Sequence, residues 1–220
     1  MSNLKSDILF AEAPANQLRV LIVDDHPLMR LGVAAMINSQ EDMTVIGQAG
    51  NVEDAVRVFQ EKNPDLVLMD LRLPDASGVT AIRRIVAIAP QVRIVVLTTY
   101  EGDEDIHQAL AAGAMGYIVK GMSRRALIDA VRRVQAGQKF LPSVVNDTLS
   151  SRTPASVLTQ REQEVLKLMF RGKSNREIAD LLQIRETTAK THVSVVLTKL
   201  NVEDRTQAVV EGLKRGLIHL

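Results

Sequence analysis

The sequence of 220 residues contains no cysteine and no tryptophan, with only two tyrosines and four phenylalanines. Without cysteine the chain can form no disulfide, no thiolate zinc site and no cysteine nucleophile, and such a composition is typical of a reducing compartment. With so few aromatic rings it has little on which unpaired bases could stack, which disfavours binding of single-stranded nucleic acid.

Long hydrophobic runs are also missing. The longest nearly apolar stretch, Ala109–Val119, is well short of the ~20 residues that cross a bilayer. Residues 1–17 contain one lysine and the short apolar run Ile8-Leu9-Phe10, which does not fit a signal peptide. The sequence therefore predicts a soluble, cytoplasmic protein with no membrane partner.

Net charge is nearly absent, because 27 Lys and Arg face 26 Asp and Glu, for a formal charge of +1. The charges are unevenly placed, however. Residues 151–220 contain 12 basic and 8 acidic side chains, a charge of +4, whereas residues 1–150 contain 15 and 18, a charge of −3. The chain thus joins an acidic part to a basic part, and only the basic part suits nucleic acid.

Strand and helix patterns alternate over residues 18–136, after an N-terminal extension at 1–17. Unbroken, β-branched apolar runs are typical of strands buried on both faces. They lie at Val20–Val23, Thr44–Gln48, Leu66–Met69, Ile94–Leu97 and Tyr117–Val119. Helical spacing follows each run, and Ser123 is placed to cap the last helix. Five alternations predict an α/β fold with a doubly wound parallel sheet.

The alternation ends at Gly137. Residues 137–156 have no hydrophobic period, which predicts a linker. Residues 157–220 are helical in pattern only and predict a second, all-α domain of four helices. Its first helix follows the capping-box pair Thr159 and Glu162. The other three are expected at Asn175–Leu182, Thr187–Leu200 and Arg205–Arg215.

Polar residues stand where four of the predicted strands end: Asp24, Asp25, Asp70, Thr98 and Lys120. In an open parallel sheet, ligands bind beyond the carboxyl ends of the strands. Three carboxylates in one crevice need protons or cations, and Mg²⁺ together with a lysine meets that need. A carboxylate beside a metal ion, a hydroxyl and a lysine suits phosphoryl transfer onto the carboxylate.

Each of these residues also has an ordinary structural explanation. Asp24 and Asp25 can be turn or capping residues, Lys120 alone can be a solvated lysine, and Thr98 alone can be a strand residue. Their placement at the ends of four strands of one sheet favours a functional site.

This set, with 28 residues from Asp70 to Thr98 and 50 from Asp70 to Lys120, resembles the receiver domain of two-component response regulators. The resemblance covers residues 18–136 and implies a flavodoxin-like sheet of order 2-1-3-4-5. It implies that Asp70 is the phosphoacceptor and that a sensor histidine kinase is the donor.

The resemblance also implies a role for each neighbour of Asp70. The implied Mg²⁺ ligands are Asp70, Asp25 directly, Asp24 through water, and the backbone carbonyl of Arg72. Thr98 would be the switch hydroxyl that moves to the phosphoryl oxygen, with Tyr117 as its aromatic partner. Lys120 would pair with the phosphate.

The helix expected at residues 187–200 has two different faces. Its apolar stripe consists of Val193, Val196, Leu197 and Leu200, and the residues largely off the stripe are Lys190, Thr191, Ser194 and Thr198. Such a helix can enter the major groove, and Asn175–Leu182 completes a helix-turn-helix. On this pattern alone, a four-helix adaptor with a solvated face is the alternative.

The segment LTQREQEVLKLMFRGKSNREIADLLQIRETTAKTHVSVVLTKLNV resembles the LuxR-type DNA-binding domain, over residues 157–218. The resemblance implies base contacts from Lys190, Thr191 and Ser194. It implies phosphate contacts from Thr187, Thr188, Asn175 and His192, and more loosely from Arg176 and Lys199. Arg185 stands where the family usually has Ser or Thr, so the recognition helix is expected to lack its usual N-cap. Ala189 and Ser194 are smaller than is common there, which affects sequence preference rather than binding mode.

Together these patterns predict a response regulator of the NarL/FixJ class: a phosphorylation-regulated transcription factor, not an enzyme, that binds two half-sites of double-stranded DNA as a homodimer when phosphorylated. Two alternatives stay open. DNA binding could be independent of phosphorylation, or Asp70 could serve an aspartyl-phosphate hydrolase, which would leave residues 157–218 without a role.

Two other features predict no site. The four histidines, at positions 26, 107, 192 and 219, are scattered and lack the spacing of metal ligands. Gly172-Lys173-Ser174 resembles the end of a phosphate-binding loop, but Lys167 occupies the place of its first glycine and no strand precedes it, so ATP binding is not expected.

Overall fold

A computed structural model describes residues 17–99, 102–150 and 157–219. The chain divides into two compact units. The first comprises Met1–Thr99 and Gln108–Pro142, and the second Tyr100–His107 and Ser143–Leu220. Nearly all of the predicted N-terminal extension, residues 1–16, lies outside the described residues.

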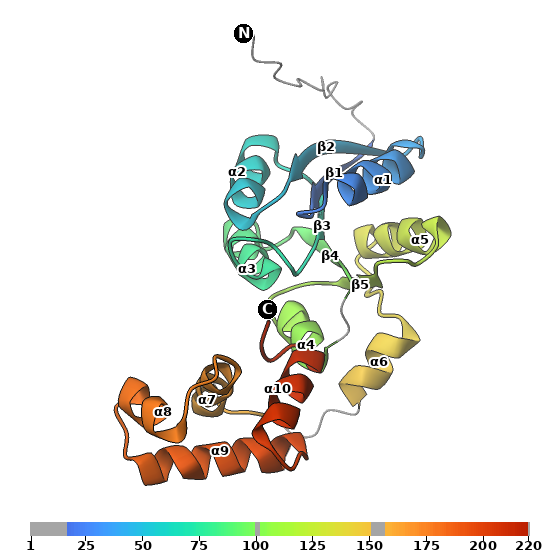
Figure 1. The fold of residues 1–220 in the computed structure, drawn as a ribbon. Helices are drawn as coiled ribbons and strands as arrows, with labels where there is room; N and C mark the ends of the chain where they lie inside the picture. The colour runs from blue at the N-terminus through green and yellow to red at the C-terminus, as the bar shows by residue number, and fades with distance from the viewer. Residues whose placement is uncertain (1–16, 100–101, 151–156, 220) are drawn as a thin grey trace. The chain divides into compact units, whose positions relative to one another are not determined.

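The first unit is built on a five-stranded sheet in the order β2-β1-β3-β4-β5 (Figure 1). The strands are β1 (Leu18–Val23), β2 (Met43–Ala49), β3 (Leu66–Met69), β4 (Arg93–Thr98) and β5 (Gly116–Val119). All four neighbouring pairs run parallel. The predicted α/β class, the parallel sheet and its strand order are confirmed.

The helices that alternate with these strands along the chain are α1 (Pro27–Asn38), α2 (Val52–Lys62), α3 (Gly78–Ile88), α4 (Asp103–Ala111) and α5 (Arg124–Gln135). The first part of α4, up to His107, groups with the second unit. Buried side chains of α1 and α5 share one core with alternate residues of the strands, such as Val20 and Ile22 of β1. Helices α1 and α5 contact each other, and so do helices α2 and α3, as Figure 1 shows for α2 and α3. The Ser123 hydroxyl accepts a hydrogen bond from the Ala126 amide, which confirms the predicted cap of α5.

Helix α6 (Ser143–Ser150) lies inside the stretch predicted as a linker, so this stretch contains a helix that the sequence pattern did not predict. The helix has eight residues and buries mainly Val145. One buried side chain gives no repeating apolar period, so the sequence pattern could not show it. Residues 143–150 group with the second unit, and the boundary expected at 156–157 stays a prediction.

Four helices form the core of the second unit: α7 (Gln160–Phe170), α8 (Asn175–Leu182), α9 (Glu186–Leu200) and α10 (Arg205–Lys214). They confirm the predicted all-α, four-helix domain. Capping boxes start α7, with Thr159 and Glu162, and α8, with Ser174 and Glu177. None of the helices in the described ranges combines the length and apolar character that a bilayer crossing requires.

Candidate functional site

Two aspartates lie side by side because β1 and β3 are in register. Val23 pairs with Met69 across the parallel ladder, so Asp24 and Asp70 leave the sheet together. The Asp70 amide donates to the Val23 carbonyl at 2.8 Å, and the Asp24 amide donates to the Ala49 carbonyl at 3.1 Å. Asp24 and Asp70 are only 1% and 2% exposed. The fold thus buries two carboxylates at the carboxyl edge of the sheet.

Lys120 follows β5 and reaches these two carboxylates. Its Nζ donates to Asp70 Oδ2 at 2.5 Å, and it lies 2.7 Å from Asp24 Oδ2 as an ion pair without hydrogen-bond alignment. Burial alone would lower the pKa of Lys120, but its contacts with the two carboxylates outweigh burial and raise it. The side chain is therefore a buried ammonium, and its pairing with the phosphate stays a prediction.

Asp70 is held in an environment that disfavours its charge. Burial raises the pKa of its carboxyl group, and the nearby charge of Asp24 adds to this, while Lys120 and the Arg72 amide act in the opposite direction. The Arg72 amide donates to Asp70 Oδ1 at 3.1 Å. Together with half-buried Asp25, three carboxylates face one ammonium, so the cluster attracts a further cation.

Several polar atoms near the strand ends have unused bonding capacity. Among the described residues, Asp24 Oδ2, Asp25 Oδ1 and Thr98 Oγ1 are buried without a hydrogen-bond partner. Such atoms are costly unless a ligand or solvent satisfies them. Carboxylate oxygens of this kind fit a hard divalent cation such as Mg²⁺.

Thr98 and Tyr117 lie on the neighbouring strands β4 and β5, and both side chains are fully buried. Their burial places the predicted switch hydroxyl and its aromatic partner inside the first unit. The Lys120 amide donates to the Thr98 carbonyl at 2.7 Å, which connects the two strand ends through the backbone. The roles of Thr98 and Tyr117 in switching stay predictions.

His26 belongs to the acidic cluster, although it was not among the predicted ligands. Its Nδ1 lies 3.2 Å from Asp24 Oδ1 and 2.5 Å from Asp25 Oδ1. Ligand atoms of Asp24, Asp25, His26 and Asp70 all lie within 4.8 Å of one another, as in a metal site. The spacing between histidines does not predict a role for His26, but its position directly after two aspartates in the sequence could have.

Gly78, the first residue of α3, packs directly against the backbone of Asp70. A Cβ atom there would clash with the Asp70 carbonyl oxygen and would lie 2.8 Å from the Leu71 Cα. The Gly78 amide donates to the Leu71 carbonyl at 2.9 Å. This close approach fixes the backbone that carries Asp70. The direction of the Arg72 carbonyl, a predicted metal ligand, stays a prediction.

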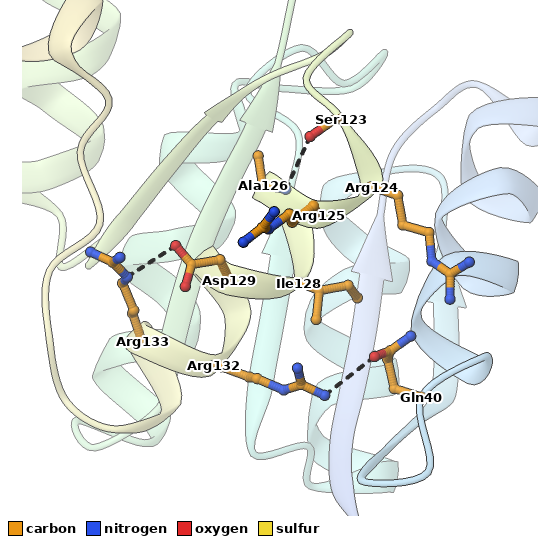
Figure 2. Close-up of a pocket in the computed structure, with 9 residues that line it drawn as sticks. All are labelled: Gln40, Ser123, Arg124, Arg125, Ala126, Ile128, Asp129, Arg132 and Arg133. Carbon is orange, nitrogen blue, oxygen red and sulfur yellow. Dashed lines mark hydrogen bonds and ion pairs between the residues drawn. The ribbon is translucent and has the colours of Figure 1, made fainter.

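A separate groove of about 860 Å³ runs along α5 of the first unit (Figure 2). Four arginines line it, at positions 124, 125, 132 and 133. Arg132 donates to Gln40 at 3.2 Å, and Arg133 forms an ion pair with Asp129 at 3.0 Å. The groove shares no residue with the acidic cluster, so its size does not make it the site of the phosphoryl chemistry.

In the second unit, α9 has the two faces that its sequence predicted. Ala189, Val196 and Leu200 are buried, and Val193 and Leu197 pack against the same core. The predicted base-contacting residues Lys190, Thr191 and Ser194 are exposed, as are Thr187 and Thr188. Because the apolar side of α9 packs in the core, the helix presents its polar side to solvent.

The start of α9 lacks a side-chain cap, as expected. Arg185 occupies the N-cap position and forms no capping hydrogen bond. Gln183 ends α8 in the left-handed region, at φ 53°, and so makes the turn of the helix-turn-helix. Lys190 forms only an exposed i,i+4 ion pair with Glu186, at 2.9 Å, and such pairs contribute little. Lys190 can therefore exchange this partner for a nucleic acid group.

Lys199 has an internal partner that the sequence did not indicate. Its Nζ donates to Glu162 Oε2 at 2.7 Å and to the Val157 carbonyl at 3.1 Å. This contact ties α9 to the capping box of α7. A DNA contact from Lys199 would require the ammonium to leave Glu162, and that contact stays a prediction. Asn175 and His192 are half-buried, and Asn175 Oδ1 has no hydrogen-bond partner among the described residues.

Both halves of the chain match known protein families. Residues 20–132 match the response regulator receiver domain, and residues 156–211 match the bacterial regulatory proteins of the luxR family. The chain is 40% identical over 206 residues to the response regulator protein VraR of Staphylococcus epidermidis, covering 91% of this chain and 99% of that protein.

Another relative and a solved structure agree with these matches. The chain is 38% identical over 214 residues to the uncharacterized transcriptional regulatory protein YxjL of Bacillus subtilis, covering 92% and 98% of the two chains. RcsB of Salmonella enterica serovar Typhimurium, solved on a promoter with the phosphomimetic BeF3−, is 26% identical with a TM-score of 0.70, covering 89% and 98%. The chain therefore belongs to the two-component response regulators of the NarL/FixJ class, with a receiver domain and a LuxR-type DNA-binding domain.

Proposed function

We propose that Asp70 of this phosphorylation-regulated transcription factor accepts a phosphoryl group from a sensor histidine kinase, and that this reaction controls binding of double-stranded DNA by α9. The observation that carries the proposal is the buried Asp70 carboxylate in contact with the Lys120 ammonium, beside Asp24 Oδ2 and Asp25 Oδ1, which form no hydrogen bond among the described residues. The matches to receiver and DNA-binding families support it.

The acidic cluster fits a divalent cation, which we propose to be Mg²⁺ in this reaction. The residues that would hold it are Asp24, Asp25, Asp70 and, through its carbonyl, Arg72. When bound, the ion would offset the charges of the carboxylates and of the phosphoryl oxygens. Asp24 Oδ2 and Asp25 Oδ1, which are buried and form no hydrogen bond among the described residues, are the atoms that support this assignment.

The chain's own residues account for the transfer. A carboxylate oxygen of Asp70 attacks phosphorus while the bond from phosphorus to the kinase imidazole nitrogen breaks, and the electron pair of that bond returns to the imidazole. Lys120 then pairs with a phosphoryl oxygen, and the Thr98 hydroxyl, unpartnered before the reaction, donates to another. The new group carries a charge of about −1.5 to −2 and three strong acceptors, and it therefore favours a rearrangement of Thr98 and Lys120 at the ends of their strands.

On DNA, we propose that α9 lies in the major groove. The residues proposed to contact bases are Lys190, Thr191 and Ser194, and those proposed to contact phosphates are Thr187, Thr188, Asn175 and His192. A single recognition helix reads a short half-site, so a homodimer on two half-sites supplies the affinity. Solved structures of RcsB, a structural neighbour, contain DNA and dimers. A cytoplasmic location follows from this proposed role.

The test is a combined measurement of mass and DNA affinity for the full chain, with and without beryllofluoride and Mg²⁺. We expect both the mass and the affinity to rise when the aspartyl-phosphate mimic is present. Unchanged DNA affinity in beryllofluoride would favour DNA binding that is independent of phosphorylation. Steady-state release of phosphate from a small phosphate monoester would instead favour the hydrolase alternative.

A further inference from the structure

We propose that His26 supplies an imidazole nitrogen to the cation held by the acidic cluster, and so gives this receiver a stronger preference for transition-metal ions such as Mn²⁺ and Ni²⁺ over Mg²⁺. The proposal rests on the proposed function of the cluster as a divalent cation site. It adds a nitrogen ligand to a set that otherwise offers only oxygen.

The position of the His26 ring supports this role. Nδ1 lies within 3.2 Å of one carboxylate oxygen from each of two residues, Asp24 and Asp25. The contact of Nδ1 with Asp24 Oδ1 is a hydrogen bond when the ring carries its proton on Nδ1. In the other tautomer, Nδ1 presents a lone pair to the same space as the carboxylate oxygens. Ligand atoms of Asp24, Asp25, His26 and Asp70 lie within 4.8 Å of one another, close enough to share one cation.

The backbone holds the ring at this position. The His26 amide donates to Asp24 Oδ1 at 2.8 Å, and the residue precedes Pro27, the first residue of α1. His26 occupies the N-cap position in extended conformation, yet its side chain forms no capping hydrogen bond. The ring is therefore not needed to start α1, and 70% of its side-chain surface is accessible to an incoming ion.

Ligand chemistry gives the expected selectivity. Carboxylate and carbonyl oxygens suit Mg²⁺, whereas imidazole nitrogen suits later first-row ions, whose affinities rise from Mn²⁺ to Ni²⁺. A pocket with oxygen ligands alone already follows this order weakly. An added nitrogen should widen the difference between Ni²⁺ and Mg²⁺, and removing it should narrow that difference without abolishing Mg²⁺ binding.

The first test compares cation binding to the full chain and to His26→Gln by titration calorimetry with Mg²⁺, Mn²⁺ and Ni²⁺. We expect His26→Gln to lose about tenfold or more in Ni²⁺ affinity, since even residues that only support a ligand change metal affinity by about 10–100-fold. Its Mg²⁺ affinity should stay within about twofold. The matched control is His107→Gln, which replaces another exposed histidine and should change neither affinity.

A second measurement detects the bound nitrogen directly. Pulsed electron paramagnetic resonance of the Mn²⁺-loaded full chain should show nuclear modulation from a directly bound ¹⁴N, which His26→Gln should remove and His107→Gln should retain. Absence of ¹⁴N modulation, or equal Ni²⁺ affinity in His26→Gln and the unchanged protein, would overturn the role of His26 alone. If the unchanged protein bound no divalent cation, the proposed cation site itself would fail.

Discussion

The acidic cluster of the first unit is built from buried charges, whereas the face of α9 in the second unit is built from exposed polar residues. In the cluster, charged groups are buried, the pKa of Asp70 is raised, and two carboxylate oxygens form no hydrogen bond in the part of the chain that the structure describes. On α9, the polar residues are exposed on a helix anchored by a complete apolar seam. The cluster needs bound ligands to satisfy its buried polar atoms, whereas the exposed face of α9 is fully formed without a ligand.

This difference predicts how each site responds to substitution. A site made of mutually dependent buried charges loses its function when one member is removed, because the remaining charges are left uncompensated. A surface of independent contacts loses affinity in steps, one contact at a time. The following predictions test that contrast, from the largest expected effect to the smallest.

Asp70→Asn should abolish labelling by acetyl phosphate in the presence of Mg²⁺, because the carboxamide offers no nucleophilic carboxylate. Phosphate incorporation into the full chain measures this. The matched control, Asp129→Asn, removes a half-exposed carboxylate of α5 and should label normally. Undiminished labelling of Asp70→Asn would show that another residue is the phosphoacceptor.

Gly78→Ala should destabilise the protein by about 1–3 kcal/mol, the usual range for an overpacked interior, because the new Cβ would clash with backbone atoms of Asp70 and Leu71. Denaturant unfolding measures the change. Gly32→Ala is the control, since a Cβ there meets nothing within 4 Å inside α1. It should stabilise the helix by up to about 1 kcal/mol. Equal effects of the two substitutions would contradict the close approach at Gly78.

Lys190→Ala should weaken DNA binding by about tenfold, since a good base contact contributes about 1–3 kcal/mol, and it should also relax sequence preference. Fluorescence anisotropy with operator and scrambled DNA measures both effects. Lys199→Ala should leave binding at α9 much less affected, because that ammonium is paired with Glu162. A larger loss in Lys199→Ala would contradict the division between exposed and internal lysines.

Lowering the pH should have opposite effects on stability at two carboxylates, Glu177 in the second unit and Asp70 in the first. Hydrogen bonds with Ser174 and Lys173 lower the pKa of Glu177 to about 2 from 4.5, so its stabilisation is present above pH 4.5 and is lost as the pH falls toward 2. The melting temperature of Glu177→Gln should therefore lie below that of the unchanged protein at pH 6, and the difference should close in acid.

At Asp70 the sign is reversed. Because its pKa is raised in the folded state, the metal-free protein gains stability relative to Asp70→Asn as the pH falls through that pKa. Thermal unfolding of both proteins with chelator, at a series of pH values, measures this. The same pH trend at Asp70 as at Glu177 would contradict the buried, charge-disfavouring environment.

Local patterns predicted most of the fold. The buried strands are continuous apolar runs, and parallel topology then brings Asp24, Asp70 and Lys120 to one edge. The sequence pattern missed contacts between residues that are far apart in the chain, and it missed one very short helix. Lys199 pairs with a glutamate 37 residues earlier, and α6 has too few buried residues to show a period. His26 was missed because its spacing to the other histidines carries no information, whereas its position directly after Asp24 and Asp25 places it in the cluster.

Gly78 has a consequence for the genetics of this switch. The residue contributes no atom to phosphoryl transfer, yet the backbone of Asp70 lies where any side chain at that position would have to go. Selection for variants that no longer signal would therefore recover changes at Gly78 together with changes at the aspartates and the lysine. Such a screen would group Gly78 with the reacting residues, although its role is only to leave room for the backbone of Asp70.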